Sequence, residues 1–203
     1  MINVPVERFP GWVARYDAAH PDTVWRVELT SAAARSPDGT AVEVDVPFPP
    51  LPEASMAGLL AHLDRPRSLG VLLVRKGGFA VALLSGGTVV ESKVGRRHVQ
   101  GRTKAGGWSQ HRFSRRRDNQ ARAAFDAAAG HVRRILGDSA ASLDLLGTGG
   151  DRQAVASVLA HPDLRPLVGV PTAWLGAVPD PTRAVLDTAI VDARSVRVAI
   201  TDP

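Results

Sequence analysis

The sequence predicts an α/β (α+β) fold in which helices flank a mixed β-sheet. Three observations support this prediction: short segments of alternating apolar and polar residues are separated by glycine pairs, a helical apolar stripe occupies the middle of the chain, and strand and helix patterns alternate in its last third. With 203 residues, 44% of them hydrophobic, the chain can bury a substantial core. We expect a single domain over residues 1–203, composed of an N-terminal extension (1–65) and a core (66–203).

The N-terminal extension is expected to form a helix, a hairpin and a second helix. Apolar and polar residues alternate before and after Pro37-Asp38-Gly39, which has the composition of a tight turn. Prolines at positions 47, 49, 50 and 52 then form a connector that cannot continue a strand. The expected elements are a helix over residues 8–19, a strand over 23–30, a strand over 42–46 and a helix over 53–63.

The core is expected to begin with a three-stranded meander, because Gly77-Gly78 and Gly86-Gly87 separate three apolar segments. A long helix with an apolar stripe follows and ends at Gly137. The motif Gly147-Thr148-Gly149-Gly150-Asp151 lacks the Lys-Ser/Thr pair of a phosphate-binding P-loop, so we interpret it as a strand-to-helix turn with a capping aspartate. The expected elements are strands over 69–74, 79–84 and 88–94, a helix over 115–136, a strand over 142–146, a helix over 151–160, an apolar stretch around 174, a helix over 181–193 and a strand over 196–200.

Positive charge is concentrated in residues 92–117, which contain nine Lys or Arg and no Asp or Glu. The whole chain has 25 basic and 20 acidic residues, so the remainder has 16 basic and 20 acidic residues, a net charge of −4 against +9 in the segment. Such a segment suits a polyanion, since each cation placed on a phosphate releases condensed counterions. A solvated surface is the alternative, but the Gly, Gln and Trp within this mid-chain segment favour nucleic acid as the partner.

The candidate site residues lie in or beside a loop expected over residues 95–113. Its glycines allow the backbone to approach a ligand, and Trp108 is suited to stacking on a base. Gln100 and Gln110 cannot act as strong bases but can orient a water molecule. The arginines at 115–117 are expected in the first turn of the long helix, where the helix dipole disfavours cations that no anion covers. The candidate RNA-binding residues are Lys93, Arg96, Arg97, His98, Arg102, Lys104, Gly106, Gly107, Trp108, Arg112, Arg115, Arg116 and Arg117.

Several other classes of site are excluded by the sequence. The chain has no cysteine, its six histidines lack metal-ligand spacing, and it contains neither a Gly-x-Ser-x-Gly motif nor a carboxylate cluster. We therefore expect no metal, no cofactor and no conventional hydrolase machinery. The N-terminus does not resemble a secretory signal, and no apolar run is long enough to span a membrane. We expect a cytoplasmic protein without a membrane partner.

The sequence from the basic loop into the long helix resembles a known family. A Gly-Gly pair and Gln110 precede Arg112-Phe113-Ser114-Arg115-Arg116-Arg117. This arrangement is similar to the central domain of eukaryotic and archaeal class I peptide-chain release factors, which has a Gly-Gly-Gln loop followed by Arg-Phe-Ala-Arg-x-Arg. The whole chain more closely resembles the Vms-like release factor family, in its actinobacterial and chloroflexal branch. The similarity is strongest over residues 69–146.

The resemblance implies a fold like the release-factor central domain, with the basic loop projecting from a β-hairpin. It also implies a ribosome-associated peptidyl-tRNA hydrolase that releases nascent peptide from stalled complexes on the large subunit, with water positioned by a loop glutamine. An ungapped alignment places Trp108 where the family has the Gln of Gly-Gly-Gln, so the catalytic residue is Gln110 or Gln100. The chain has no candidate stop-codon-reading domain. Two alternatives remain open: an endonuclease that cuts the tRNA 3′ end, and a non-catalytic RNA- or ribosome-binding module.

Overall fold

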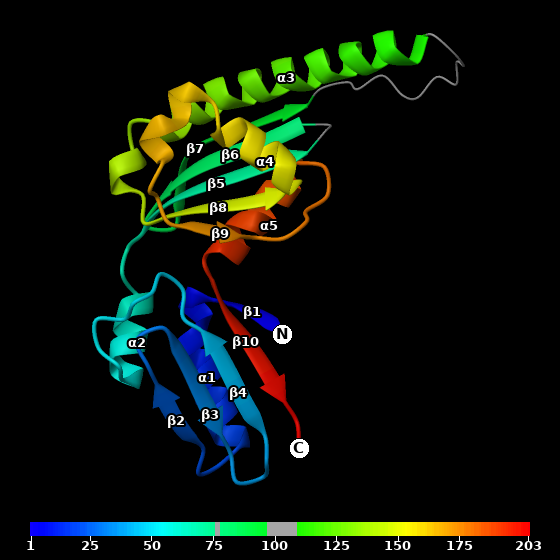
Figure 1. Cartoon of the computed structure of the whole chain (residues 1–203). Helices are drawn as coiled ribbons and strands as arrows, with labels where there is room; N and C mark the ends of the chain where they lie inside the picture. The colour runs from blue at the N-terminus through cyan, green and yellow to red at the C-terminus, as the bar shows by residue number, and fades with distance from the viewer. Residues whose placement is uncertain (76–77, 97–108) are drawn as a thin grey trace. The chain divides into compact units, whose positions relative to one another are not determined.

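The structure is a computed structural model that describes residues 1–75, 78–96 and 109–203, with only the backbone described for 109–121 (Figure 1). Backbone contacts divide the chain into two compact units. The terminal unit consists of Met1–Pro66 and Val191–Pro203, and the central unit consists of Arg67–Ile190. The boundary after Pro66 coincides with the expected start of the core, whereas the C-terminal residues group with the N-terminal extension. The single domain over 1–203 stays a prediction.

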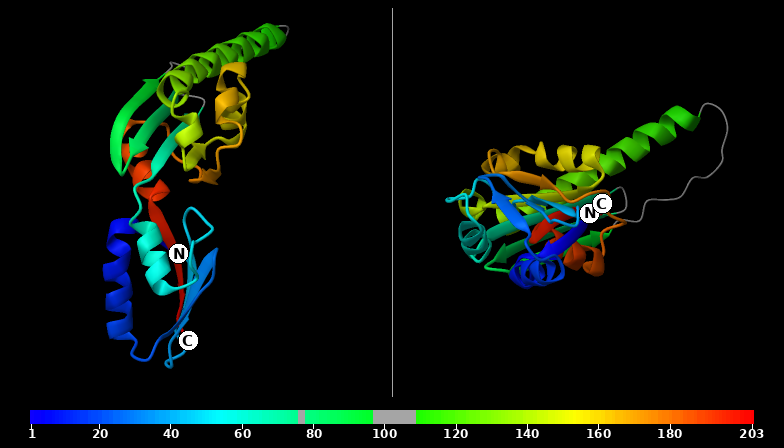
Figure 2. Two further views of the ribbon diagram at one scale, coloured as in Figure 1. Left: turned by 90° about the vertical axis from the view of Figure 1, so that its left-hand side faces the viewer. Right: turned by 90° about the horizontal axis from the view of Figure 1, so that it is seen from below.

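The terminal unit contains a five-stranded antiparallel sheet of strand order β1-β10-β4-β3-β2. Both of its α-helices lie on one face of this sheet (Figure 2). Their apolar side chains share a buried cluster with Val42, Val44, Val196 and Val198 from the two central strands. Its elements are β1 (Ile2–Pro5), the 3₁₀ helix η1 (Val6–Arg8), α1 (Phe9–Ala19), β2 (Val24–Val27), β3 (Ser31–Arg35), β4 (Ala41–Asp45), α2 (Met56–Leu63) and β10 (Ser195–Thr201).

The expected hairpin between residues 23–30 and 42–46 is wrong, because β3 lies between these two strands in the sheet. The turn Pro37-Asp38-Gly39 joins β3 to β4 instead. The sequence of β3, Ser-Ala-Ala-Ala-Arg, has no β-branched or aromatic residue and therefore carries no strand signal. Ala32 and Ala34 are nonetheless buried in the same cluster as Phe9 of α1. Burial beneath the helix, which local propensity does not encode, determines this strand.

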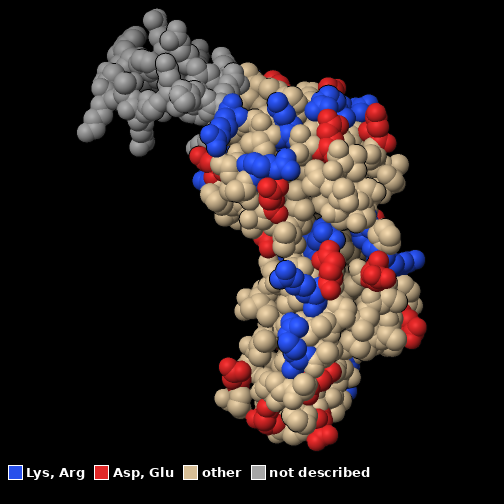
Figure 3. Space-filling view, turned by 180° about the vertical axis from the view of Figure 1, so that it is seen from behind, with Lys and Arg blue, Asp and Glu red and all other residues tan. Residues whose placement is uncertain are grey.

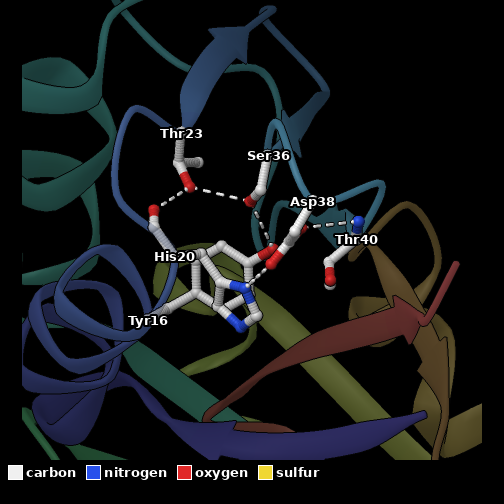
Figure 4. A network of polar contacts seen from close by, with 6 residues as sticks. All are labelled: Tyr16, His20, Thr23, Ser36, Asp38 and Thr40. Carbon is white, nitrogen blue, oxygen red and sulfur yellow. Dashed lines mark hydrogen bonds and ion pairs between the residues drawn. The ribbon is translucent and has the colours of Figure 1, made fainter.

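A polar network joins the C-terminal end of α1 to the β3–β4 turn (Figure 4). His20 Nδ1 lies 2.6 Å from Asp38 Oδ2, and the Thr40 backbone N–H donates to Asp38 Oδ1 at 2.9 Å. The buried Ser36 hydroxyl lies 3.1 Å from the Tyr16 hydroxyl and 2.8 Å from that of Thr23. The hydrogen bond from His20, followed by that from the Thr40 backbone, holds the pKa of Asp38 below its ordinary value. The ionised Asp38 side chain therefore links the C-terminal end of α1 to the β3–β4 turn through its hydrogen bonds.

We predict that Asp38→Asn lowers the stability of the terminal unit in a pH-dependent manner. Because the folded-state pKa is depressed, the ionised carboxylate contributes stability that is fully present above the unfolded pKa of about 3.9 and is lost as pH falls through the folded pKa. The variant should unfold at lower urea concentration than the parent at pH 7, and the two midpoints should converge below about pH 4. Urea unfolding followed by tryptophan fluorescence measures this, with the exposed Asp45→Asn as control. A midpoint difference that stays constant from pH 7 to pH 3 would contradict the prediction.

The central unit contains a mixed five-stranded sheet of order β7-β6-β5-β8-β9. The first three strands form the expected antiparallel meander, and β8 and β9 add to it in parallel. Its elements are β5 (Ser68–Arg75), β6 (Gly78–Ser85), β7 (Thr88–Arg96), α3 (Ser109–Leu136), η2 (Ala140–Ser142), β8 (Leu145–Gly150), α4 (Arg152–Leu159), η3 (Pro162–Leu167), β9 (Thr172–Trp174) and α5 (Arg183–Ala193), the last of which ends in the terminal unit. No helix among the described residues is long and apolar enough to cross a membrane.

Helices cover both faces of the central sheet (Figure 1). On one face, Leu72 and Val81 share a buried cluster with Val132 of α3 and Val158 of α4. On the other, Arg183 of α5 donates to Ser92 Oγ at 3.0 Å. Coverage on both sides explains the nearly continuous apolar sequence of β5, because a strand buried on both faces has no solvent-facing positions. The predicted α/β fold is confirmed.

The Gly147-Thr148-Gly149-Gly150 segment is part of β8, so its interpretation as a turn is wrong. Glycine is required here because neighbouring atoms approach the backbone closely. A Cβ on Gly149 would lie 3.0 Å from Leu73, and one on Gly150, where φ is +105°, would lie 2.3 Å from the Val74 carbonyl oxygen. The expected cap is confirmed: the Asp151 side chain accepts from the Ala154 backbone N–H at 3.0 Å and begins α4.

We predict that Gly150→Ala destabilises the protein more than Gly169→Ala. Both glycines have positive φ (+105° and +95°), but no atom lies within 4 Å of a Cβ at Gly169. Gly169→Ala should cost about 1–2 kcal/mol from backbone strain alone. Gly150→Ala adds the collision with the Val74 oxygen and should cost roughly 1–3 kcal/mol more. Chemical denaturation measures the free energy of unfolding of both variants. Equal decreases would show that the close contact with the Val74 oxygen does not add to the cost.

Candidate nucleic-acid interface

The basic segment leaves the central sheet at the end of β7, an edge strand. Lys93 and Arg96 are exposed on this strand, opposite Val81 and Gly78 of β6. Gly95 lies between them, and a Cβ there would come within 2.3 Å of the Phe79 ring. The glycine therefore leaves room for the aromatic ring beside the strand, immediately before the basic loop begins.

The structure brings part of the predicted site onto two elements. Lys93 and Arg96 lie on β7, and the backbone of α3 contains Gln110, Arg112, Arg115, Arg116 and Arg117. The remaining candidates lie outside the described residues: Arg97, His98, Gln100, Arg102, Lys104, Gly106, Gly107 and Trp108.

The helix begins at Ser109, six residues earlier than the sequence predicts. Arg115 is consequently the seventh residue of α3, and the expectation that residues 115–117 occupy its first turn is wrong. Gln110 is the second residue of the helix instead. It lies among the first four backbone N–H groups, which have no partner within the helix and carry its positive partial charge.

The N-terminal half of α3 extends past the ends of the sheet strands (Figure 1). Phe125 is the first residue of α3 that packs against the buried cluster among those whose side chains are described. At 1.5 Å per residue, the sixteen residues 109–124 span about 24 Å. The helix therefore carries the positions of Gln110 and the arginine-rich sequence well away from the sheet.

The described arginines of the central unit differ in how their charge is compensated. Arg75 Nε lies 3.5 Å from Asp180 Oδ1, Arg183 pairs with Asp187 at 3.0 Å, and Arg134 pairs with Glu91. Within the part of the chain that the structure describes, neither Lys93 nor Arg96 belongs to an ion pair. Lys and Arg side chains lie over the end of the unit from which α3 projects, with Asp and Glu interspersed (Figure 3). Uncompensated positive charge on the described part of β7 thus lies next to the basic loop.

Two further arginines of the central unit make contacts that the sequence did not reveal. The Arg152 guanidinium lies 4.2 Å from the centroid of the Trp174 ring, and Arg75 donates to the Val178 carbonyl oxygen at 2.7 Å. The parallel pairing of β5, β8 and β9 brings the C-terminal ends of these strands, and with them the two arginines, to the same end of the sheet. No pattern of charge or spacing along the chain could have indicated this juxtaposition.

Hydrolytic groups do not assemble among the described residues. The network in Figure 4 contains Ser36, His20 and Asp38, but Ser36 contacts Tyr16 and Thr23 rather than the His20 ring. It therefore lacks the serine–histidine contact of a catalytic triad. No group of three His, Cys, Asp or Glu side chains in the described chain could hold a metal ion. The chemistry that the arrangement supports is binding of a polyanion by the β7–α3 region.

Comparison with known proteins shows what the chain is similar to. A family model described as "Actinobacteria/chloroflexi VLRF1 release factor" matches residues 67–199. The solved structure described as "Vms1 mitochondrial localization core" is similar with a TM-score of 0.51 at 10% sequence identity, covering 83% of this chain and 76% of that one. An archaeal translation termination factor, aRF1, gives a TM-score of 0.42 at 14% identity, covering 79% of this chain and 48% of that one. No curated protein sequence matches the chain. At this identity, the likeness to the Vms1 core establishes a shared fold.

We predict that replacing Arg115, Arg116 and Arg117 together by alanine weakens binding to ribosomes or RNA. If these residues contact phosphates, each contributes about 0.7 to the slope of log affinity against log salt, so the slope should become shallower by about 2. Filter binding at several salt concentrations measures this change. The control replaces the exposed Arg26, Arg35 and Arg165, which changes the net charge equally. Equal slopes for the parent and the 115–117 variant would remove these arginines from the interface.

Proposed function

The chain belongs to the actinobacterial and chloroflexal VLRF1 release-factor family, and on this premise we propose that it is a peptidyl-tRNA hydrolase. Its substrate is the ester that joins a nascent peptide to tRNA on the large subunit of a stalled ribosome. A water oxygen attacks the ester carbonyl carbon, the bond to the ribose oxygen breaks, and that oxygen takes up a proton. The products are a free peptide acid and an intact tRNA.

The observation that carries this proposal is the position of Gln110 at the second residue of a helix that projects about 24 Å from its scaffold. A projecting helix can insert its tip into a narrow ribosomal site while the rest of the protein stays outside. The ribosome binds and orients the ester, so the protein needs only to position water and stabilise charge. Such a mechanism needs neither the serine–histidine contact of a catalytic triad nor a metal-binding group, and neither is found among the described residues.

Two groups at the helix tip suit the transition state. A glutamine amide both donates and accepts hydrogen bonds, so it can orient a water molecule without removing its proton. The backbone N–H groups of the first turn are free of partners within the helix and favour an anion, such as the oxyanion that develops on the ester carbonyl. We therefore favour Gln110 over Gln100, which lies outside the described residues.

The arginine-rich sequence of α3 suits a role in holding tRNA or ribosomal RNA. Helical spacing of 100° per residue places positions 112, 115, 116 and 122 along one side of α3. Position 110 falls on the opposite side, in line with the stripe that contains Ala128 and Val132. Position 117 falls on the same side as position 110. A phosphate backbone bound along positions 112, 115, 116 and 122 would therefore lie opposite the glutamine position, with position 117 as the exception.

The sequence differs from the family pattern at Trp108, and a second activity is an alternative for this family. Because tryptophan occupies the position of the family glutamine in an ungapped alignment, the catalytic residue is Gln110 or Gln100. The alternative reaction is cleavage of the tRNA 3′ end, which the resemblance to the family leaves open. The two activities differ in their products: hydrolysis releases peptide and leaves full-length tRNA, whereas an endonuclease shortens the tRNA. A non-catalytic binding module would yield neither product.

We predict that Gln110→Ala slows peptide release about a hundredfold, because one positioned hydrogen-bonding group is lost in the transition state. Ribosome binding should remain unchanged, since a group that acts only in the transition state does not contribute to ground-state binding. The measurement is single-turnover release of labelled peptide from stalled ribosome–peptidyl-tRNA complexes, with electrophoresis to establish that the tRNA stays intact.

Gln100→Ala is tested in parallel, and Gln153→Ala on the exposed surface of α4 serves as a matched control. A loss confined to Gln100→Ala would transfer the catalytic role to that residue. Release at the parent rate by both variants would refute hydrolysis positioned by glutamine.

A further inference from the structure

An open cavity of about 300 Å³ lies in the central unit where α3 leaves the sheet. It is at the lower end of the size range of small-molecule sites. Strand ends from β5, β6 and β7 form one side, and a single stretch of α3 forms the other. The lining residues are Val74, Arg75, Gly78, Phe79, Gly95, Arg96, Ala123, Ala124, Phe125, Ala127 and Ala128.

The walls of the cavity are apolar and partly aromatic. Phe79 is stacked on His131 of α3, with ring centroids 5.3 Å apart and an interplanar angle of 27°. This stacking and the contact with Gly95 fix the orientation of the Phe79 ring. Phe125 contributes a second aromatic side chain, and the alanines of α3 keep the helix side shallow. The fixed Phe79 ring and the Phe125 side chain therefore both line a space that larger side chains on α3 would fill.

Positive charge accompanies this apolar surface. Arg75 is held by Asp180 and by the Val178 carbonyl oxygen, which fixes its position. Arg96 is exposed, belongs to no ion pair among the described residues, and is the last residue of β7 before the basic loop. Arg96 therefore adds a positive charge to the cavity lining at the point where the described part of β7 ends.

We propose that the cavity takes one unstacked nucleobase of the bound RNA, with the adjoining phosphate on Arg96. Aromatic and aliphatic walls suit the face of a base, and an uncompensated guanidinium suits its phosphate. The combination favours a nucleotide over an apolar peptide side chain, which would leave Arg96 without a partner. The inference rests on the proposed function only in taking RNA as the partner, and it extends the interface from phosphate contacts to recognition of a single base.

The test fills the cavity without changing charge. Ala123 and Ala127 are exposed on α3, and leucine is a good helix former, so Ala123→Leu and Ala127→Leu should fold normally. Ala156→Leu, on the exposed surface of α4, is the matched control. The probe is a short single-stranded RNA containing one 2-aminopurine, whose fluorescence reports stacking, together with the same RNA carrying an abasic site at that position.

The parent and Ala156→Leu should bind the 2-aminopurine RNA roughly tenfold or more tightly than the abasic RNA, and Ala127→Leu should lose this difference. Arg96→Gln should reduce competition by adenosine 5′-monophosphate to the level of adenosine. Equal affinity of the parent for the two RNAs would overturn the proposal, as would displacement of the probe by an apolar tripeptide but not by the nucleotide.

Peptide release is measured separately. Base-dependent binding without release would refute the proposed hydrolase activity alone, and release without base-dependent binding would refute the proposed base-binding cavity alone.

Discussion

The position of the candidate interface depends on the packing of the C-terminal half of α3 against the central sheet, mainly over β6 and β7. The side chains at this contact are all at most 1% exposed: Leu72, Val74, Val81, Ala128, Val132 and Leu136. Burial of each larger aliphatic side chain contributes about 1.5–3 kcal/mol, so the far half of the helix is firmly fixed. Helical continuity then carries the position of Gln110, which no contact of its own with the sheet needs to hold. In this arrangement, the C-terminal half of α3 stabilises the fold, and its N-terminal half is free to reach a partner.

Small side chains on α3 both end its packing against the sheet and leave the space of the cavity. From Phe125 towards its N-terminus, α3 lines the cavity with Ala124 and Ala123, where larger side chains would fill the space beside the sheet. Small residues leave space between the helix and the end of the meander, and Gly95 allows the Phe79 ring to lie against β7 instead of entering that space. Helix departure and an open aromatic wall therefore have one origin in side-chain size.

Local patterns predicted the elements whose signals are local. Glycine pairs and apolar strands were enough for the β5–β6–β7 meander, and the apolar stripe was enough for the packed half of α3. The alanine strand β3 and the glycine strand in β8 could not be predicted, because long-range burial selects alanine in one and close approach of Val74 selects glycine in the other. Charge alone pointed to Lys93 and Arg96, whereas the cavity is assembled from four separate chain segments and leaves no pattern in any of them.

Pairing of charges reduces the attraction for polyanions of several arginines in the central unit. Acidic side chains compensate arginines on several elements: Arg67 pairs with Asp144, Arg133 with Asp138 and Arg134 with Glu91. At an ionic strength of 0.15 M, fields decay within about 8 Å, so such locally paired arginines contribute little to attraction at longer range. The acid-free segment that begins after Glu91 has no compensation of this kind in its sequence. Under the proposed function, the densest positive charge that RNA phosphates would meet is therefore in the sequence at the end of β7 and along the projecting half of α3.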